Sequence, residues 1–118
     1  MNNSVYRFSL DLDKQDSQEY VTVRRGDTAK KLSVLLRESG TPYIIADGTT
    51  VVLAARKSDG TYINASCTVA DNRIEAVLPA EFTANVGALT ACFGLSGEGS
   101  AALSSPPFTI FVDDKPTA

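Results

Sequence analysis

Hydrophobic and polar residues alternate along most of this chain, and a period of two is the pattern of half-buried β-strands. The segment VYRFSLDLD carries its apolar side chains at Tyr6, Phe8, Leu10 and Leu12. Similar segments recur, separated by turn residues roughly every 8 to 12 positions, as in two-layer all-β domains. The sequence therefore predicts an all-β fold: an immunoglobulin-like, antiparallel β-sandwich of about eight short strands with one short helical turn.

Alternate residues of a strand lie on the same face, so the core of this sandwich is predicted from the face of each segment that carries the apolar residues. Segment 61–70 is interpreted as one continuous strand in which Ile63, Ala65, Cys67 and Val69 share a face. Over the whole chain, the residues expected in the core are Phe8, Leu10, Val34, Leu36, Leu53, Ile63, Ile74, Leu89, Phe93, Phe108 and Ile110.

Turn residues separate the predicted strands. Asp59-Gly60 is a strong hairpin signal because glycine adopts a positive φ at low cost. The Asp71-Asn72 pair predicts a second turn. Pro79 suits the first position of a helical turn and Gly87 can end one, so a short helical turn is expected between them.

The tripeptide Arg25-Gly26-Asp27 matches a known integrin-binding signal, but it lies between two strand-like segments. Gly26 permits a positive φ, and an aspartate such as Asp27 can hydrogen-bond its own backbone, so both residues suit a chain reversal. A match of three residues also recurs by chance in unrelated chains. We interpret Gly26 and Asp27 as a structural turn and not as an adhesion site.

Size and composition fit one folded domain, since the chain has 118 residues, of which 43% are hydrophobic and 21% charged. We expect the sandwich to span residues 1–112, and residues 113–118 to form a polar tail or the start of a linker. The first residues lack the apolar stretch of a signal peptide. No apolar run reaches the roughly 18 residues of a membrane span. The chain is therefore expected to be made in the cytoplasm and to bind no membrane.

The net charge of −3 disfavours binding to nucleic acid, because that affinity comes mainly from neutralising phosphates with Lys and Arg. One basic cluster, formed by Arg24, Arg25, Lys30 and Lys31, is interrupted by Asp27. We interpret it as a solvated face of a strand and a turn.

Catalysis and metal binding find little support in the sequence. Histidine is absent, which removes Ser-His-Asp and Cys-His arrangements and one common zinc ligand. The acidic segment from Asp11 to Asp16 lacks the glycine and the final glutamate of a calcium loop, and Glu81 has no carboxylate partner nearby in sequence. Cys67 and Cys92 have opposite parities, which argues against a disulfide. We expect no catalytic residue, no cofactor and no metal.

Several strings in the chain occur in an order that resembles one family. They are RRGDTAKKLSVLLRESGTPY, DGTTVVLAARKSDGTYI, CTVADNRIEAVLPAEFTANVGALTACFGLS and FTIFV. Their order resembles the N-terminal domain of the upper baseplate protein of tailed phages that infect Gram-positive bacteria. In that family the domain is a β-sandwich of a virion structural protein, and it anchors distal parts of the adsorption apparatus to the tail hub.

The resemblance implies a phage or prophage module of the virion tail baseplate, which binds other tail or baseplate proteins, or itself. The family's Gly-Asp-Thr turn falls on the segment from Gly26 to Thr28. Docking is expected to bury a surface patch or to pair an exposed strand edge, with Val5–Leu12 and Phe108–Val112 as edge candidates. Family members are often longer than this sequence, which stops at Ala118, so the resemblance does not carry over a receptor-binding role.

A carbohydrate-binding β-sandwich is the alternative. Such modules usually stack sugar rings on exposed aromatic side chains. The chain has four Tyr and no Trp, which makes this alternative weaker without removing it.

Overall fold

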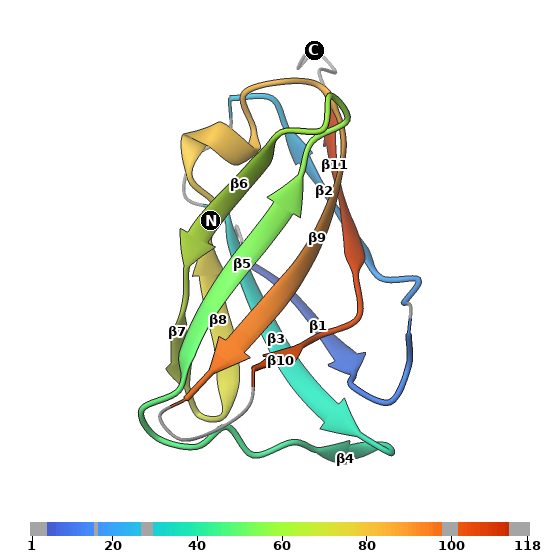
Figure 1. Ribbon diagram of the computed structural model, residues 1–118. Coiled ribbons are helices and arrows are strands. Elements are labelled where there is room, and N and C mark those ends of the chain that lie inside the picture. Colours follow the sequence, from blue (N-terminus) through green and yellow to red (C-terminus); the bar gives the residue numbers. More distant parts are fainter. Residues whose placement is uncertain (1–4, 16, 27–29, 98–101, 114–118) are drawn as a thin grey trace.

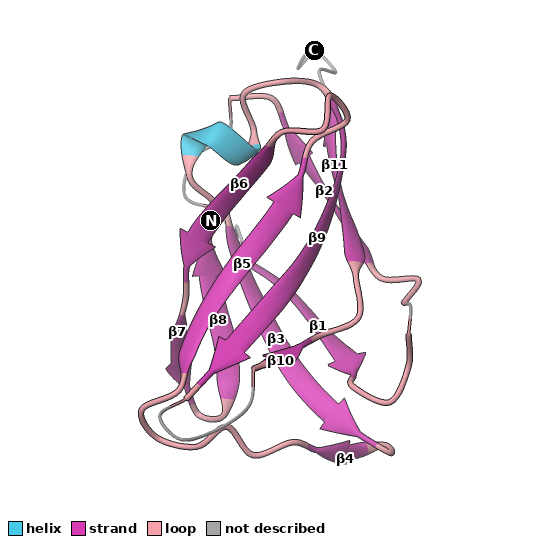
Figure 2. Cartoon of the chain, viewed as in Figure 1, coloured by secondary structure: helices cyan, strands magenta, loops and turns pink. Residues whose placement is uncertain are grey.

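The computed structural model describes residues 5–15, 17–26, 30–97 and 102–113, and it shows two β-sheets packed face to face (Figures 1 and 2). The strands of sheet A are β1 (Val5–Asp11), β3 (Lys31–Glu38), β4 (Thr41–Pro42), β7 (Thr68–Ala70) and β8 (Arg73–Val77). Those of sheet B are β2 (Tyr20–Arg24), β5 (Thr50–Arg56), β6 (Tyr62–Ser66), β9 (Gly87–Ser96), β10 (Leu103–Ser104) and β11 (Phe108–Asp113). Sheet A has the order β1-β3-β8-β7, and sheet B the order β2-β11-β9-β5-β6, with β4 paired to β3 and β10 to β9.

The all-β sandwich predicted from the sequence is confirmed, but its sheets are mixed and not purely antiparallel. Strand β1 is parallel to β3, and β2 is parallel to β11. The chain passes from β1 in sheet A to β2 in sheet B and back to β3. Because β2 runs the opposite way, β3 returns beside β1 in the same direction (Figure 1). Alternation predicts the face of a residue but says nothing of the direction of the neighbouring strand.

The core lies between the two sheets and contains most of the residues predicted for it, together with Phe82 and Ile45 from outside the predicted strands. Phe8 and Ile63 are only half-buried, because they lie on the edge strands β1 and β6. Three rings meet in the core: the Phe108 centroid lies 5.5 Å from that of Phe93 and 5.2 Å from that of Phe8. The predicted core residues that are buried are Leu10, Val34, Leu36, Leu53, Ile74, Leu89, Phe93, Phe108 and Ile110.

The segment expected as one strand over residues 61–70 is two strands in different sheets. Its first half, β6, pairs with β5 of sheet B, and its second half, β7, pairs with β8 of sheet A. The change occurs at Cys67, and Val69 is consequently exposed instead of buried. This division and two strands of two residues each raise the number of strands in the described residues to eleven instead of about eight.

Two hairpins have the turns that their residues favour. In the β5–β6 hairpin, the Gly60 N–H donates to the Lys57 carbonyl at 2.9 Å, and Gly60 has a φ of 90°. The Thr61 N–H donates to the Asp59 carboxylate at 2.9 Å. The β7–β8 hairpin turns on Asp71 and Asn72, whose φ values are both positive, at 53° and 62°. Two successive positive φ values characterise the type I′ turn, which matches the twist of hairpin strands.

The expected helical turn between Pro79 and Gly87 is the short 3₁₀ helix η1 (Ala80–Phe82). Pro79 caps this helix from outside instead of forming its first residue, and Gly87 begins β9 instead of ending the helix. Phe82 anchors η1, since its side chain is buried in the core. No helix in the described part of the chain is long and apolar enough to cross a membrane.

The edges of the sheets differ from expectation at one end of the chain. The first strand, β1, is an edge of sheet A as expected, but β11 lies inside sheet B between β2 and β9. β2 therefore pairs with the side of the last strand that would otherwise be a free edge. β2 and β6 are the edges of sheet B. β11 extends to Asp113, one residue beyond the expected end of the sandwich.

Candidate interaction surface

A row of five side chains crosses the outer face of sheet B, the face directed away from the core. Strand register makes them cross-strand neighbours in the order Tyr20, Thr109, Thr90, Arg56 and Tyr62. This cross-strand row reaches from the edge strand β2 to the edge strand β6. Tyr20 and Tyr62 at its ends are 63% and 68% exposed.

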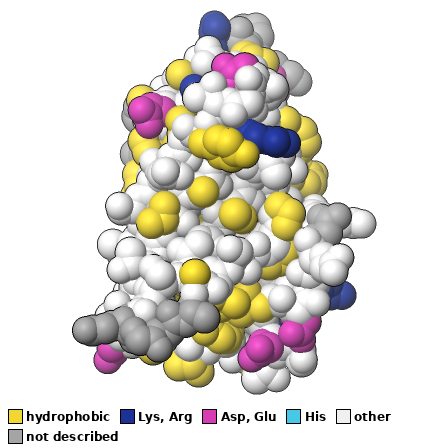
Figure 3. Space-filling model, viewed as in Figure 1, with side chains coloured by type: hydrophobic (Ala, Val, Ile, Leu, Met, Phe, Trp, Pro, Cys, Tyr) yellow, Lys and Arg dark blue, Asp and Glu magenta, His cyan; other side chains and the backbone are white. Residues whose placement is uncertain are grey.

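The rest of the outer face of sheet B is made of small or uncharged side chains. The charged residues that this parity contributes in the described strands are Arg24, Asp113 and Arg56, all near the end where β2, β11 and β5 finish. Figure 3 shows the middle of the face without Lys, Arg, Asp or Glu. The other residues of the face are Thr22, Thr50, Val52, Ala54, Asn64, Ser66, Ala88, Cys92, Gly94, Ser96 and Phe111.

The outer face of sheet A has the opposite character. The Lys31 ammonium lies 3.1 Å from the Glu75 carboxylate. The Arg73 guanidinium donates to the Ser33 hydroxyl at 2.7 Å and to the Ser33 carbonyl at 3.0 Å. Arg7 adds another exposed charge on the edge strand β1. Burying such charges against a partner costs more free energy than burying the largely uncharged middle of the outer face of sheet B.

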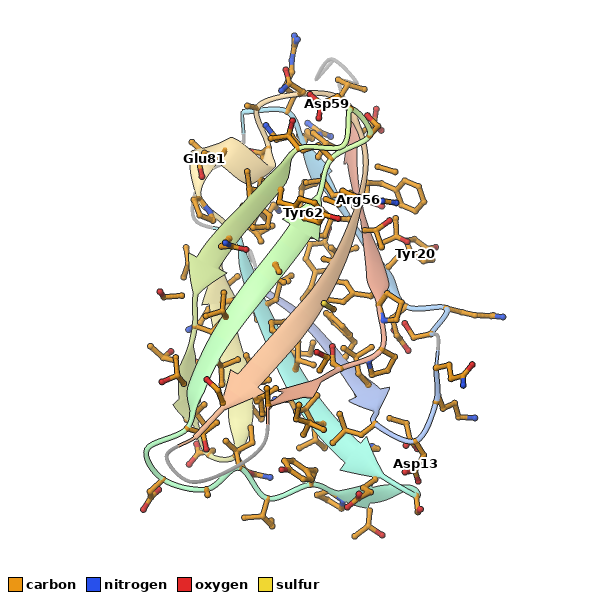
Figure 4. The ribbon with its side chains drawn as sticks, viewed as in Figure 1. Asp13, Tyr20, Arg56, Asp59, Tyr62 and Glu81 are labelled. Atoms are coloured by element: carbon orange, nitrogen blue, oxygen red, sulfur yellow. The ribbon has the colours of Figure 1, made fainter. Side chains whose placement is uncertain are left out.

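Aromatic side chains mark both edges of the outer face of sheet B. The rings of Tyr20 and Phe111 meet edge-to-face, with centroids 5.7 Å apart and planes at 75°. Phe111 is 43% exposed. On the opposite edge, Tyr62 is the cross-strand neighbour of Arg56, and both point outward from the same end of the sheet (Figure 4). Tyr and Arg are, with Trp, the side chains enriched at the energetic centres of protein interfaces.

The described residues bring together little that resembles a catalytic or metal centre. No three His, Cys, Asp or Glu side chains among them gather as metal ligands. The Asp13 carboxylate accepts a hydrogen bond from the Ser39 hydroxyl, and Glu81 lies exposed on η1 (Figure 4). Cys67 and Cys92 are free thiols. Burial raises the pKa of Cys67 to about 11 and also raises that of Cys92, so both thiols are protonated near neutral pH.

The structure places most of the predicted turn residues at one end of the sandwich. Asp59 and Gly60 lie in the β5–β6 hairpin, and a Cβ atom on Gly87 would lie 3.6 Å from the hydroxyl of Ser58 in that hairpin. Gly26 has a φ of 85°, and its N–H donates to the carbonyl of Thr83 at 2.8 Å, close to η1. Asp27 lies outside the described residues.

The outer face of sheet B was not predicted, because core prediction uses only the apolar parity of a strand. The signal lies in the alternate residues that point away from the core. At these outward positions the strands of sheet B have residues such as Ala54, Thr90 and Cys92, whereas the strands of sheet A have charged residues such as Arg7 and Glu75. Comparing the charge of these positions between strands would have separated the two faces.

The outer face of sheet B thus combines exposed aromatic side chains at its edges with a middle that lacks charged side chains. No protein-family profile matches the chain, and no curated protein sequence matches it. Among solved structures, the fold is similar to the N-terminal domain of phage TP901-1 ORF48, with a TM-score of 0.73 and 17% sequence identity. The likeness covers 93% of this chain and 99% of that domain. It confirms, at the level of the fold, the resemblance to an N-terminal baseplate domain seen in the sequence.

Proposed function

We propose that this chain is a phage or prophage virion structural module. In this proposal it docks distal parts of the baseplate and adsorption apparatus to the tail through protein–protein contacts. The observation that carries the proposal is the exposed, largely uncharged outer face of sheet B. The likeness to an N-terminal domain of a phage protein supports the same role.

Docking by this face is favourable because its burial removes aromatic and aliphatic surface from water while desolvating few charges. Tyr20, Phe111 and Tyr62 supply large apolar rings that are already held by the sheet. A rigid side chain loses little conformational entropy on binding, so more of its contact energy remains as affinity. The partners are other tail or baseplate proteins or further copies of the chain, and the chain acts in the tail baseplate after synthesis in the host cytoplasm.

The proposed role requires no chemistry from the chain, so we propose that it is not an enzyme. The thiols are protonated near neutral pH, and Glu81 is a lone carboxylate on a surface turn. Weak contacts of one copy are sufficient in an assembly, because many copies are held at high effective concentration.

A carbohydrate-binding role is the second candidate, and the exposed rings of Tyr20 and Tyr62 favour it. The cross-strand row separates these two residues by four strand spacings of about 4.8 Å, or about 19 Å. They therefore cannot stack on the same sugar ring, and Tyr20 already presents its edge or face to Phe111. These features favour a protein partner with an extended contact surface over a single sugar ring.

The test is to purify tails from cells that express the chain with its neighbouring phage genes, and to measure its copy number per tail by mass spectrometry. We expect a fixed number of copies, with antibody label at the tail tip in electron micrographs. The same chain on a glycan array is expected to retain no sugar. Absence from tails together with micromolar retention of a polysaccharide would establish the carbohydrate-binding role instead.

A further inference from the structure

The end of sheet B that carries Arg56 is hollowed. A shallow depression of about 380 Å³ lies beside the β5–β6 hairpin, and its lining includes Arg56, Lys57, Ser58, Asp59 and Thr90. Arg56 and Thr90 are also neighbours in the cross-strand row. The hollow therefore opens onto the largely uncharged outer face of sheet B and is continuous with it.

Two cations meet in this hollow. Within the described residues, the Arg56 guanidinium makes no ion pair and no side-chain hydrogen bond. The hydroxyl groups of Ser58 and Thr90 line the same depression and can donate hydrogen bonds. The cations and hydroxyl groups together form a set of donors that outnumbers the one carboxylate in the lining of the hollow.

One carboxylate, that of Asp59, also lines the hollow, but its own turn engages it. It accepts a hydrogen bond from the Thr61 N–H at 2.9 Å, and hydrogen bonds from Thr61 lower its pKa below the usual value. The hollow thus keeps a net positive charge, from Arg56 and Lys57 against Asp59, in a chain whose net charge is −3.

A second hollow of about 220 Å³ adjoins the same hairpin and includes Glu81, Lys57 and Phe82 in its lining. Lys57 lines both hollows, whereas Arg56 lines only the first. A substitution of Arg56 therefore alters the first hollow directly and leaves the lining of the second hollow unchanged.

We propose that the hollow at Arg56 is a carboxylate-binding site, and that its occupant in the virion is an Asp or Glu side chain of the protein that docks on the outer face of sheet B. The planar guanidinium of Arg56 matches a carboxylate in two-point hydrogen bonding. Lys57 adds charge, and the Ser58 and Thr90 hydroxyls supply further donors.

Charge complementarity selects this occupant. A partner that covers the largely uncharged outer face of sheet B also removes the Arg56 guanidinium from water. A carboxylate of the partner at this end of the face would pair with that guanidinium and offset the cost of its desolvation. The identity of the occupant as a partner protein rests on the proposed function, whereas the preference of the hollow for carboxylate does not.

The first experiment tests the site on the isolated chain. Sodium acetate is titrated into ¹⁵N-labelled protein, with sodium chloride at matched ionic strength as reference, and amide shifts are followed by NMR. We expect saturable shifts at Lys57, Ser58 and Thr90, with half-saturation at millimolar acetate. Arg56→Ala is expected to weaken this response at least tenfold, and Arg7→Ala on the outer face of sheet A to leave it unchanged.

Two outcomes overturn the site. Acetate shifts no larger than those from chloride, or a response that survives in Arg56→Ala, would mean that the hollow does not select carboxylate. Inorganic phosphate is titrated in parallel. Phosphate binding more than tenfold tighter than acetate would replace the carboxylate with a phosphate group, as carried by a phosphate-bearing polymer.

The second experiment tests the occupant. Tails are purified from a strain that lacks the gene for this chain, and binding of the added chain to them is measured. We expect Arg56→Glu to bind at least tenfold more weakly than the natural chain, and Arg7→Glu to bind within twofold of it. Equal binding by Arg56→Glu overturns the carboxylate contact but leaves docking intact. Failure of the natural chain to bind overturns the proposed function, and the acetate titration then decides the site alone.

Discussion

The rings of Tyr20 and Phe111 meet edge-to-face across two parallel strands, with centroids 5.7 Å apart. Parallel pairing of β2 with β11 brings them together, because it places Tyr20 opposite Thr109, one outward position from Phe111. The contact fixes both rings on the outer face of sheet B before any partner arrives. A fixed aromatic pair of this kind is suited to serve as an anchor in an interface.

Replacing Tyr20 with alanine is expected to weaken binding of the chain to tails that were assembled without it. The expected loss is about tenfold or more, and tenfold corresponds to about 1.4 kcal/mol. Because Tyr20 is 63% exposed, the free energy of unfolding should fall by only about 1 kcal/mol or less. Tyr20→Phe keeps the ring and should keep most of the binding. Unchanged binding by Tyr20→Ala would exclude this edge of the face from the interface.

Phe108→Ala should destabilise the fold by about 3–5 kcal/mol, because it leaves a cavity where three rings meet. Urea unfolding followed by tyrosine fluorescence measures this loss. Phe111→Ala is the matched control on the same strand, since its ring points outward, and it should cost about 1 kcal/mol or less. Equal losses for the two variants would contradict the register of β11.

The Asn72 side chain joins the β7–β8 turn to the chain after β4. Its amide donates to the Tyr43 carbonyl at 2.9 Å, and its carbonyl accepts from the Ile45 N–H at 2.8 Å. Asn72→Gly keeps the positive φ but removes both bonds, so it should cost about 1–3 kcal/mol and speed hydrogen exchange at Ile45. Asp71→Gly removes neither bond and should be close to neutral. Slow hydrogen exchange at the Ile45 amide in Asn72→Gly would show that the Asn72 side chain does not hold this segment in place.

How far the sequence predicts this structure differs between the core and the surface. Residues such as Val34 and Ile110 are buried as their parity predicts, because burying one face of a strand selects a single register. The parallel pairing of β1 with β3 was not predictable, since it depends on the route of the chain between sheets. The change from sheet B to sheet A at Cys67 was not predictable for the same reason. The alternation of residues continues unbroken through this position, so the sequence does not show where the strand changes its pairing partner.

The candidate surface was harder to predict than the core for a physical reason. Tyr20 and Arg56 are 36 positions apart in the sequence, and only the order of the strands in sheet B puts them in one row. The hollow at Arg56 also needs Thr90 from a third strand. Local patterns identify the turn at Asp59 and Gly60 but cannot show that the turn borders a hollow.

The Cys67 thiol should react slowly at moderate pH. Burial raises its pKa to about 11, against about 8.5 for an unfolded cysteine, so its thiolate fraction at pH 8 is lower by a factor on the order of a hundred. Iodoacetamide labelling followed by mass spectrometry should show a rate that keeps rising towards pH 11.

The pKa of Cys67 is higher in the folded than in the unfolded state, so this thiol stabilises the folded state below about pH 8.5. That contribution is lost as the pH rises through the folded pKa. Rapid labelling at pH 8 in folded protein would contradict the burial of this thiol, and two unlabelled cysteines in unfolded, unreduced protein would reveal a disulfide.

The Arg25-Gly26-Asp27 tripeptide should not mediate cell adhesion. Its central glycine adopts a φ of 85° and donates its N–H to the carbonyl of Thr83 at 2.8 Å, so the backbone at this position is tied to the loop after η1. An adhesive loop presents the tripeptide freely, whereas a turn uses it to reverse the chain. Asp27→Glu is therefore expected to leave the attachment of integrin-expressing cells to immobilised protein unchanged, with a scrambled tripeptide as the negative control. Loss of attachment on this one substitution, in a chain with an unchanged unfolding midpoint, would mean that the tripeptide is a recognition signal after all.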